Sequence, residues 1–273
     1  MKLQLRKFDI STIPDDKVVV FIGMRNTGKS FLVKDLLYHH RDLPIGTVIS
    51  GTESANKFYS DIIPSFFIHE KITPNIISNV LKRQQLITKR INKQIKKHGK
   101  SNIDPRAFLI LDDCLYNKNW VNDENIRALF MNGRHYKIMF LITMQYPLGI
   151  PPNLRTNIDY VFILRENNIN NRRRIYENYA GMFPTFEIFS QTLDQTTENY
   201  ECMVIHNNAK SNKLEDQVFW YKAEFHPNFR LGAKEFWKWQ EECDDDSSDD
   251  EELFDAANLS KRKGPMISVK KSS

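Results

Sequence analysis

Gly23-Met-Arg-Asn-Thr-Gly-Lys-Ser30 matches the phosphate-binding pattern G-x-x-x-x-G-K-[ST] at every fixed position. The apolar, β-branched run Lys17–Ile22 precedes this loop, and Phe31–Leu37 follows it with helical spacing of its apolar residues. A strand, a glycine-containing turn and a helix therefore follow one another in the order that the motif requires. In such a loop, backbone N–H groups turn toward a phosphate group, and the helix N-terminus adds roughly half a positive charge.

Within this loop, two side chains have expected chemical roles. Lys29 should reach the β- and γ-phosphates of a nucleoside triphosphate, and the Ser30 hydroxyl should bind Mg²⁺. A glycine turn that carries Lys-Ser by chance is the structural alternative, but it would not need both flanking elements. We therefore expect nucleotide binding by the whole loop, which consists of Gly23, Met24, Arg25, Asn26, Thr27, Gly28, Lys29 and Ser30.

A second chemical signal is the run Pro105–Asp113, which reads as a buried strand that ends in two carboxylates. A phosphate loop needs a metal-side carboxylate from a neighbouring strand. We expect Asp112 to hold the metal ion and Asp113 to polarise the attacking water. Neighbouring residues of a strand point to opposite faces, so the backbone must turn at the end of the strand to bring both carboxylates into the cleft.

The remaining apolar runs alternate between strand and helix patterns. Several such units around a phosphate loop predict an α/β fold with a mostly parallel sheet that carries helices on both faces. The last two strands should form a hairpin or an edge pair. The predicted strands are Gly46–Ser50, Pro64–His69, Lys137–Gln145, Ile158–Leu164, Tyr200–Ile205 and Val218–Ala223, and the predicted helices are Pro74–Lys100 and Asn122–Asn132.

Composition favours one large domain of an intracellular protein. The chain has 273 residues, 41% of them hydrophobic, which is enough for a single α/β core. Cys114, Cys202 and Cys243 are far apart and form no C-x-x-C pair, which indicates a reducing compartment and no zinc site. The N-terminus lacks the apolar stretch of a secretory signal, and no run approaches the roughly 20 apolar residues of a membrane span. We expect a soluble protein without a transmembrane segment.

The net charge of +5 is unevenly distributed along the chain. Residues 241–252 form an acidic block and a basic segment follows, so we expect residues 1–240 to be the folded domain and 241–273 to be a flexible charged tail. Without the acidic block the domain is more basic, which favours a polyanionic partner. Two basic segments could contact DNA or simply face solvent: the predicted helix Pro74–Lys100 and Arg172-Arg-Arg174.

Four motifs follow one another in a diagnostic order: the phosphate loop, Leu109-Ile-Leu-Asp-Asp-Cys114, Asn132-Gly-Arg-His135 and Leu141-Ile-Thr-Met-Gln-Tyr-Pro147. This set resembles the genome-packaging ATPases of nucleocytoplasmic large DNA viruses, the poxvirus-type members of the FtsK–HerA superfamily. The stretch Gln145–Tyr160 is similar to the giant-virus branch. The resemblance covers most of residues 15–225 and does not include the charged tail.

The resemblance implies a P-loop ATPase of the additional-strand type, with ATP and Mg²⁺ as cofactors. Such a protein would form a homo-oligomeric ring and move double-stranded DNA of any sequence into a capsid. Its other partners would be capsid or portal proteins, and it would reside in the virion and in the viral factory of the host cytoplasm. Residue by residue, the resemblance assigns phosphate and metal binding to Lys29, Ser30 and Asp112.

Two further roles come from the resemblance. Gln145 would be a polar sensor of the γ-phosphate, and Arg134 would be the arginine that one subunit offers to its neighbour's nucleotide. Arg155 and Arg165 are alternatives for that arginine. The superfamily often has glutamate after the metal-side aspartate, whereas this chain has Asp113, which is one methylene shorter.

Two other classes of function are compatible with the phosphate loop. A small-molecule or nucleotide kinase would share it and would use an arginine-rich lid such as Arg172–Arg174. A nucleotide-dependent capsid-assembly scaffold would hydrolyse little ATP and could dock through the acidic tail. A GTPase is disfavoured, because Asn117-Lys-Asn-Trp120 lacks the aspartate of the guanine-reading motif Asn-Lys-x-Asp.

Overall fold

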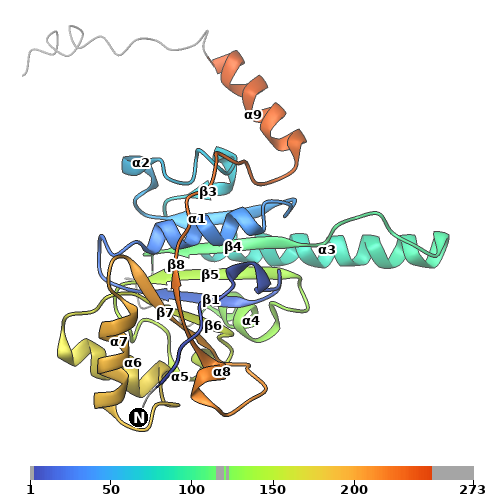
Figure 1. Cartoon of the computed structure of the whole chain (residues 1–273). Coiled ribbons are helices and arrows are strands. Elements are labelled where there is room, and N and C mark those ends of the chain that lie inside the picture. The colour runs from blue at the N-terminus through green and yellow to red at the C-terminus, as the bar shows by residue number, and fades with distance from the viewer. Residues whose placement is uncertain (1–2, 115–119, 121–122, 248–273) are drawn as a thin grey trace, which may run out of the picture.

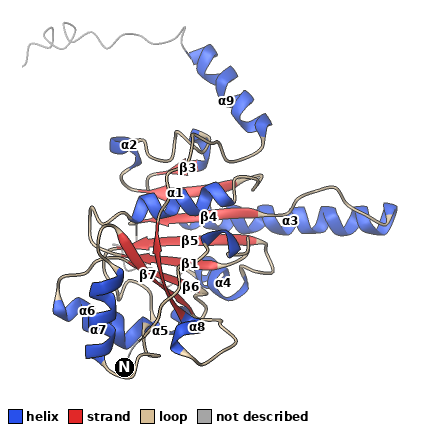
Figure 2. Ribbon diagram, viewed as in Figure 1, coloured by secondary structure: helices blue, strands red, loops and turns tan. Residues whose placement is uncertain are grey.

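The protein is described by a computed structural model that covers residues 3–114, 120 and 123–247. Its centre is an eight-stranded sheet in the order β3-β2-β4-β5-β1-β6-β7-β8 (Figure 2). All pairs from β3 to β6 are parallel, and β7 and β8 are antiparallel at one edge. The strands are β1 (Val18–Ile22), β2 (Gly46–Ser50), β3 (Ile68–His69), β4 (Ala107–Asp112), β5 (Ile138–Met144), β6 (Tyr160–Ile163), β7 (Glu201–His206) and β8 (Val218–Lys222).

The position of β5 defines the subtype of the fold. β5 pairs with β1, which leads into the phosphate loop, and also with β4, which ends at Asp112. One strand is thus inserted between the strand of the phosphate loop and the strand of the carboxylates. This confirms the predicted α/β P-loop architecture of the additional-strand type and the predicted edge pair formed by β7 and β8.

Helices cover both faces of the sheet (Figure 1). One face packs on α1 and η1, and the other packs on α3 to α7. The strand β1 shows why: Val18 and Val20 lie in one apolar cluster while Val19 and Phe21 lie in the other, and all four are buried. The helices are η1 (Ile10–Thr12), α1 (Lys29–His39), α2 (Glu53–Asn56), η2 (Ser65–Phe67), α3 (Pro74–His98), α4 (Glu124–Asn132), α5 (Pro152–Arg155), α6 (Ile169–Tyr179), α7 (Phe186–Thr196), α8 (Leu214–Gln217) and α9 (Lys234–Ser247).

One sequence prediction differs from the structure, and two helices were not predicted. The predicted strand Pro64–His69 is mostly a 3₁₀ turn, η2, and only Ile68–His69 pairs with β2. Helices α6 and α7, between β6 and β7, were not predicted. Their N-caps are the polar residues Asn168 and Thr185, whose side chains accept backbone N–H groups of the first turn. Both N-cap residues can be recognised in the sequence. The helices were not predicted because the many polar residues between the caps hide the helical spacing of the apolar residues.

Helix α9 crosses the predicted domain boundary. It begins at Lys234 and continues to Ser247, so the first residues of the predicted tail are helical. The buried Trp237 donates its indole N–H to the Leu231 carbonyl, and Gln240 accepts the backbone N–H of Ser65. These contacts hold the start of α9 against the body of the domain. Residues 248–273, the rest of the predicted tail, lie outside the described residues. None of the described helices has the length and apolarity needed to cross a membrane.

Candidate active site

The phosphate loop has the backbone geometry that its sequence predicts. It connects β1 to α1, and Gly28 adopts a left-handed conformation with φ of 100° just before the first helical residue. A Cβ atom on Gly23 would come within 2.7 Å of Thr27 Oγ1 and 2.9 Å of Leu164 Cβ, so the start of the loop is tightly enclosed. The loop therefore needs glycine at both fixed positions, once for conformation and once for space.

The Lys29 side chain lies back across the loop. Its Nζ atom donates to the carbonyl oxygens of Gly23 at 2.9 Å and Met24 at 3.1 Å, and it lies 3.6 Å from Asp113 Oδ2. The side chain is only 7% exposed. The ammonium group is thus held inside the loop by two carbonyl groups and one carboxylate, which a phosphate oxygen could replace as partners.

Asp112 ends β4 and lies in a polar row that crosses three strands. In the sheet register, Asp112 is opposite Ser50 of β2 on one side and Thr143 of β5 on the other. Its carboxylate accepts the Thr143 hydroxyl at 2.6 Å and the Ser50 hydroxyl at 3.1 Å. Burial raises the pKa of the Asp112 carboxyl, the hydrogen bond from Thr143 opposes that rise, and the charge of Asp113 adds to it.

Asp113 turns toward the same side as Asp112 because the backbone changes direction there. Its φ is 47°, in the left-handed region, and its N–H donates to Thr143 Oγ1 at 2.9 Å. The Gln145 side-chain amide donates to Asp113 Oδ2 at 2.8 Å. The structure therefore brings Lys29, Asp112, Asp113 and Gln145 together at the carboxyl ends of β1, β4 and β5. Ser50 and Thr143 were missed, although each belongs to a predicted strand next to the carboxylates.

The donor set of this cluster fits a magnesium nucleotide. Carboxylate and hydroxyl oxygens are the ligands that Mg²⁺ prefers. The second carboxylate oxygen of Asp113, Oδ1, is buried and has no hydrogen-bond partner among the described residues. A buried acceptor of this kind is suited to an O–H donor such as a water molecule of the metal shell. Ser30 is half-buried in the first turn of α1, next to Lys29.

Arg134 does not lie near this cluster. It precedes β5, whereas Gln145 follows β5. Arg134 therefore lies where the parallel strands begin, which we call the amino edge, and Gln145 lies where they end, the carboxyl edge. The strand of seven residues separates them by roughly 23 Å at about 3.3 Å per residue. Arg134 Nη2 donates to Asp159 Oδ1 at 2.7 Å, while the other oxygen of this buried carboxylate accepts the Val18 N–H. The Arg134 side chain is 53% exposed, so it is accessible from outside the subunit.

The other arginines predicted for a finger or a DNA contact have different surroundings. Arg155 bonds to Asn178 and lies over the ring of Tyr179. Arg165 is exposed just after β6, at the same edge as the phosphate loop. Arg172 makes two hydrogen bonds to Asp194 of α7 and is only 13% exposed, which corrects its candidacy as a free DNA contact or kinase lid residue.

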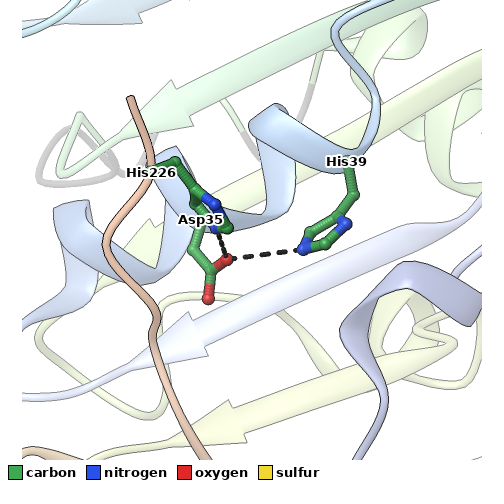
Figure 3. Close-up of side chains that lie close together, drawn as sticks. All are labelled: Asp35, His39 and His226. Carbon is green, nitrogen blue, oxygen red and sulfur yellow. Dashed lines mark hydrogen bonds and ion pairs between the residues drawn. The ribbon is translucent and has the colours of Figure 1, made fainter. Parts of the chain in front are cut away.

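A second polar cluster lies on α1, behind the phosphate loop (Figure 3). The carboxylate of Asp35 is fully buried and accepts the Tyr221 hydroxyl and the His226 Nε2 atom, both at 2.6 Å. His39 Nε2 lies 3.6 Å from the same carboxylate. The ligand atoms of Asp35, His39 and His226 lie within 4.8 Å of one another. The contacts of Asp35 with Tyr221 and His226 connect β8 and the segment that follows it to α1, the helix that begins at the phosphate loop.

Comparison with known proteins places the chain among proteins of large DNA viruses. An uncharacterised protein of Acanthamoeba polyphaga mimivirus is 45% identical over 236 residues, which are 86% of this chain and 82% of that protein. An uncharacterised protein of Invertebrate iridescent virus 6 is 41% identical over 220 residues, 80% of this chain and 81% of that protein. The chain matches no protein-family model.

Solved structures show the same fold at low sequence identity. The genome-packaging NTPase B204 from Sulfolobus turreted icosahedral virus 2, solved with AMP, has a TM-score of 0.53 and 18% identity over 78% of this chain and all of that chain. Two ATPase domains of EssC from Geobacillus thermodenitrificans have a TM-score of 0.51 and 11% identity over 93% of this chain and 53% of that chain. The chain therefore belongs to the family of large-DNA-virus proteins that includes the mimivirus and iridescent virus relatives, and it has the P-loop fold of viral genome-packaging NTPases, as its motifs indicate.

Proposed function

We propose that the protein is an ATP-driven motor that hydrolyses ATP in an oligomeric ring and moves double-stranded viral DNA into the capsid. The observation that carries this proposal is the cluster of Lys29, Asp112, Asp113 and Gln145 at the carboxyl edge of the sheet. In open α/β sheets, ligands bind at this edge. A phosphate loop with its lysine, a metal-side carboxylate and a residue that positions the attacking water are the parts that recur in ATP-hydrolysing P-loop proteins.

Each residue of the cluster has a role in this proposal. The backbone of Gly23–Ser30 cradles the phosphates, and Lys29 exchanges its loop carbonyl partners for phosphate oxygens. Ser30 and Asp112 hold Mg²⁺, which neutralises charge on the β- and γ-phosphates when it is bound. Asp113 orients the attacking water through its free carboxylate oxygen and accepts its proton. Gln145, which donates to the other oxygen of Asp113, fixes the direction of that carboxylate.

Arg134 acts on a neighbouring subunit in this proposal. Its place at the opposite edge prevents it from reaching its own nucleotide, so its only route to a γ-phosphate is through another copy of the chain. Removal of such an arginine finger reduces the rate by about 10³- to 10⁵-fold in other phosphoryl-transfer systems. Arg165 remains the alternative, since it is exposed at the edge that carries the phosphate loop.

The relatives support the proposed substrate and the proposed location of the protein. The matched proteins belong to large DNA viruses, and a structural neighbour is named as a genome-packaging NTPase. We infer double-stranded DNA as the sequence-independent partner, together with capsid or portal proteins, in the virion and in the viral factory of the host cell. Residues 1–240 would be the ATPase domain, and 241–273 would be an accessory charged tail.

The kinase alternative has lost its main support. A kinase lid needs arginines that are free to close over phosphates, whereas Arg172 is committed to Asp194, and Arg173 and Arg174 lie over the rings of Phe186 and Tyr146. A scaffold that hydrolyses little ATP would not need both carboxylates and Gln145 in one hydrogen-bonded cluster.

Steady-state ATP hydrolysis with and without long double-stranded DNA tests the proposal. Wild-type protein should show Mg²⁺-dependent hydrolysis that DNA stimulates, and Lys29→Ala should abolish both. The matched control is Lys57→Ala, because Lys57 is exposed outside the site. Hydrolysis that does not respond to DNA, or phosphate transfer to a small acceptor in place of water, would contradict the motor.

A further inference from the structure

Helix α3 is packed along only part of its length. The helix has 25 residues, and its buried residues, Ile77, Val80, Leu81 and Gln84, all lie in its first half. From Gln85 to His98 no side chain is buried, and the helix extends well beyond the sheet (Figure 1). This second half is called the arm below. Its end is capped by Gly99, whose φ of 74° is a left-handed conformation that glycine favours at the end of a helix.

The charge on this helix is entirely positive. Between Pro74 and Gly99 the sequence has no aspartate or glutamate. Along the described part of the chain, no lysine or arginine of α3 takes part in an ion pair, whereas Arg106, Arg134 and Arg172 all do. The exposed cations of the arm are Lys89, Arg90, Lys93, Lys96 and Lys97.

These charges repel one another along the helix. Lys93 has cationic neighbours at three and four positions in both directions, namely Lys89, Arg90, Lys96 and Lys97. Each like-charge pair of this kind destabilises an isolated helix. The helix dipole favours cations only in the last turn, which accounts for Lys96 and Lys97 but not for Lys89, Arg90 and Lys93. A polyanion bound along the arm would remove this repulsion.

We propose that the arm of α3 binds the phosphate backbone of double-stranded DNA. The inference rests on the proposed function for the identity of the polyanion and adds the surface that holds it. From Lys89 to Lys97 the arm rises roughly 12 Å at about 1.5 Å per residue. A duplex presents one negative charge per about 1.7 Å of its axis, so the arm can face many phosphates at once. The cationic side chains contact phosphates rather than base edges, which gives binding without sequence preference.

The base of the arm is connected to the strands that carry the active site. Gln84, which is buried, donates its side-chain amide to the carbonyl oxygens of Pro105 and Tyr136, both at 2.7 Å. These two carbonyls lie just before β4 and β5, the strands that end at Asp112 and lead to Gln145. The base of the arm is therefore hydrogen-bonded to the starts of the two strands whose other ends form the hydrolytic cluster.

Charge-neutral variants of the full chain test this surface. The arm variant carries Lys89→Gln, Arg90→Gln, Lys93→Gln and Lys97→Gln, because glutamine has a similar helix propensity. The control variant carries Lys57→Gln, Lys210→Gln, Lys213→Gln and Lys222→Gln, which remove the same charge from exposed positions elsewhere. Both are compared with wild type by circular dichroism, to verify equal helix content, and then by fluorescence anisotropy with labelled double-stranded DNA over a range of salt concentrations.

We expect the arm variant to bind DNA at least tenfold more weakly than wild type at moderate salt. The magnitude of the slope of log K against log salt should fall by about 3.6, since each of the four lost phosphate contacts removes roughly 0.9. The control variant should keep most of the affinity and slope. Equal losses in the two variants would overturn the proposal, because binding would then follow net charge. Wild type that binds an acidic peptide of residues 241–252 but no DNA would overturn it as well.

Hydrolysis assays separate this inference from the proposed function. If DNA stimulates the arm variant as much as wild type, the arm is not the DNA surface and the motor proposal stands. If the arm variant alone loses DNA binding but wild-type hydrolysis ignores DNA, the arm is the DNA surface and the motor proposal fails. Basal hydrolysis without DNA should be equal in all three proteins, because none of the substituted residues lies in the active-site cluster.

Discussion

The two edges of the central sheet hold their charges in different ways. At the carboxyl edge, Lys29 and Asp112 are buried, and one buried oxygen of Asp113 has no partner within the described part of the chain, so charged groups are concentrated where a ligand can contact them. At the amino edge, Arg134 is paired with Asp159, and Arg106 contacts three aspartates. The cations of the arm of α3, in contrast, form no ion pair with any of the residues that the structure describes. This difference is the basis for the two proposals above, which assign the chemistry to the carboxyl edge and the contacts with partners to the amino edge.

The largest expected effect concerns the contact between the amino edge of one subunit and the carboxyl edge of its neighbour. If Arg134 is the proposed arginine finger, Arg134→Ala should reduce DNA-stimulated hydrolysis by about 10³-fold or more, because the neighbouring site loses that arginine. A mixture of inactive Arg134→Ala and inactive Lys29→Ala should regain activity. In such a mixture, some sites combine the intact phosphate loop of one subunit with the intact arginine of the other. Steady-state hydrolysis of the mixed proteins measures this complementation.

The control for complementation combines two substitutions that both lie at the carboxyl edge. A mixture of Lys29→Ala and Asp113→Asn should stay inactive, since both residues belong to one subunit's cluster. If Arg134→Ala instead behaves like these two and is never rescued, Arg134 is only the partner of Asp159. Arg165→Ala should then be tested in the same mixtures.

The second prediction concerns the carboxyl edge alone. Asp113→Asn should lower the rate of ATP cleavage by about 10²- to 10⁴-fold, the usual contribution of a positioned general base. ATP affinity should stay nearly unchanged, because Asp112 and the loop still bind the metal and the phosphates. Single-turnover hydrolysis and equilibrium binding of a fluorescent ATP analogue measure the two quantities separately. Equal losses in both would place Asp113 in nucleotide binding rather than in catalysis.

The smallest effect is expected from the polar row beside Asp112. Thr143→Val removes the hydroxyl that donates to Asp112 at 2.6 Å, and loss of such a partner typically weakens metal binding about 10- to 100-fold. The hydrogen bond from Thr143 lowers the pKa of Asp112, so its loss raises that pKa further. Because Mg²⁺ binds the ionised carboxylate, the variant should lose Mg²⁺ affinity at a higher pH than wild type.

Mg²⁺ titrations of the hydrolysis rate at several pH values measure this shift. Thr12→Val is a suitable control, since its hydroxyl bonds locally to the Asp9 carbonyl and is distant in sequence from the cluster. Identical Mg²⁺ and pH dependence for Thr143→Val and wild type would mean that Asp112 does not need the hydrogen bond from Thr143 to bind Mg²⁺.

Local patterns predicted most of the elements and the chemical residues of the carboxyl edge. The phosphate loop, the strand before Asp112 and the strand before Gln145 are each specified by contiguous residues, and each was found where it was predicted. Parallel strands bring their carboxyl ends to one edge, so their convergence also followed from the sequence. Pro64–His69 was mistaken for a strand because an apolar run can also form a 3₁₀ turn.

Contacts between distant residues escaped prediction. Ser50 and Thr143 are 93 positions apart, and only the register of β2, β4 and β5 places both beside Asp112. The sequence predicted Arg172 to be free for a DNA contact or a lid, but the packing of α6 against α7 places Asp194 beside it. Asp35 and His226 are likewise joined only by the return of the chain after β8.

The sequence by itself determined the phosphate loop, the carboxylates and the alternation of strands and helices, because these depend on neighbours along the chain. Tertiary structure decided which charges are neutralised and which are left available. Arg134 and Arg172 pair with carboxylates on other elements, whereas the arm of α3 extends past the sheet and meets no carboxylate among the described residues. The physical reason is that ion pairing depends on distances of a few ångströms between segments far apart in sequence, which only the folded chain sets.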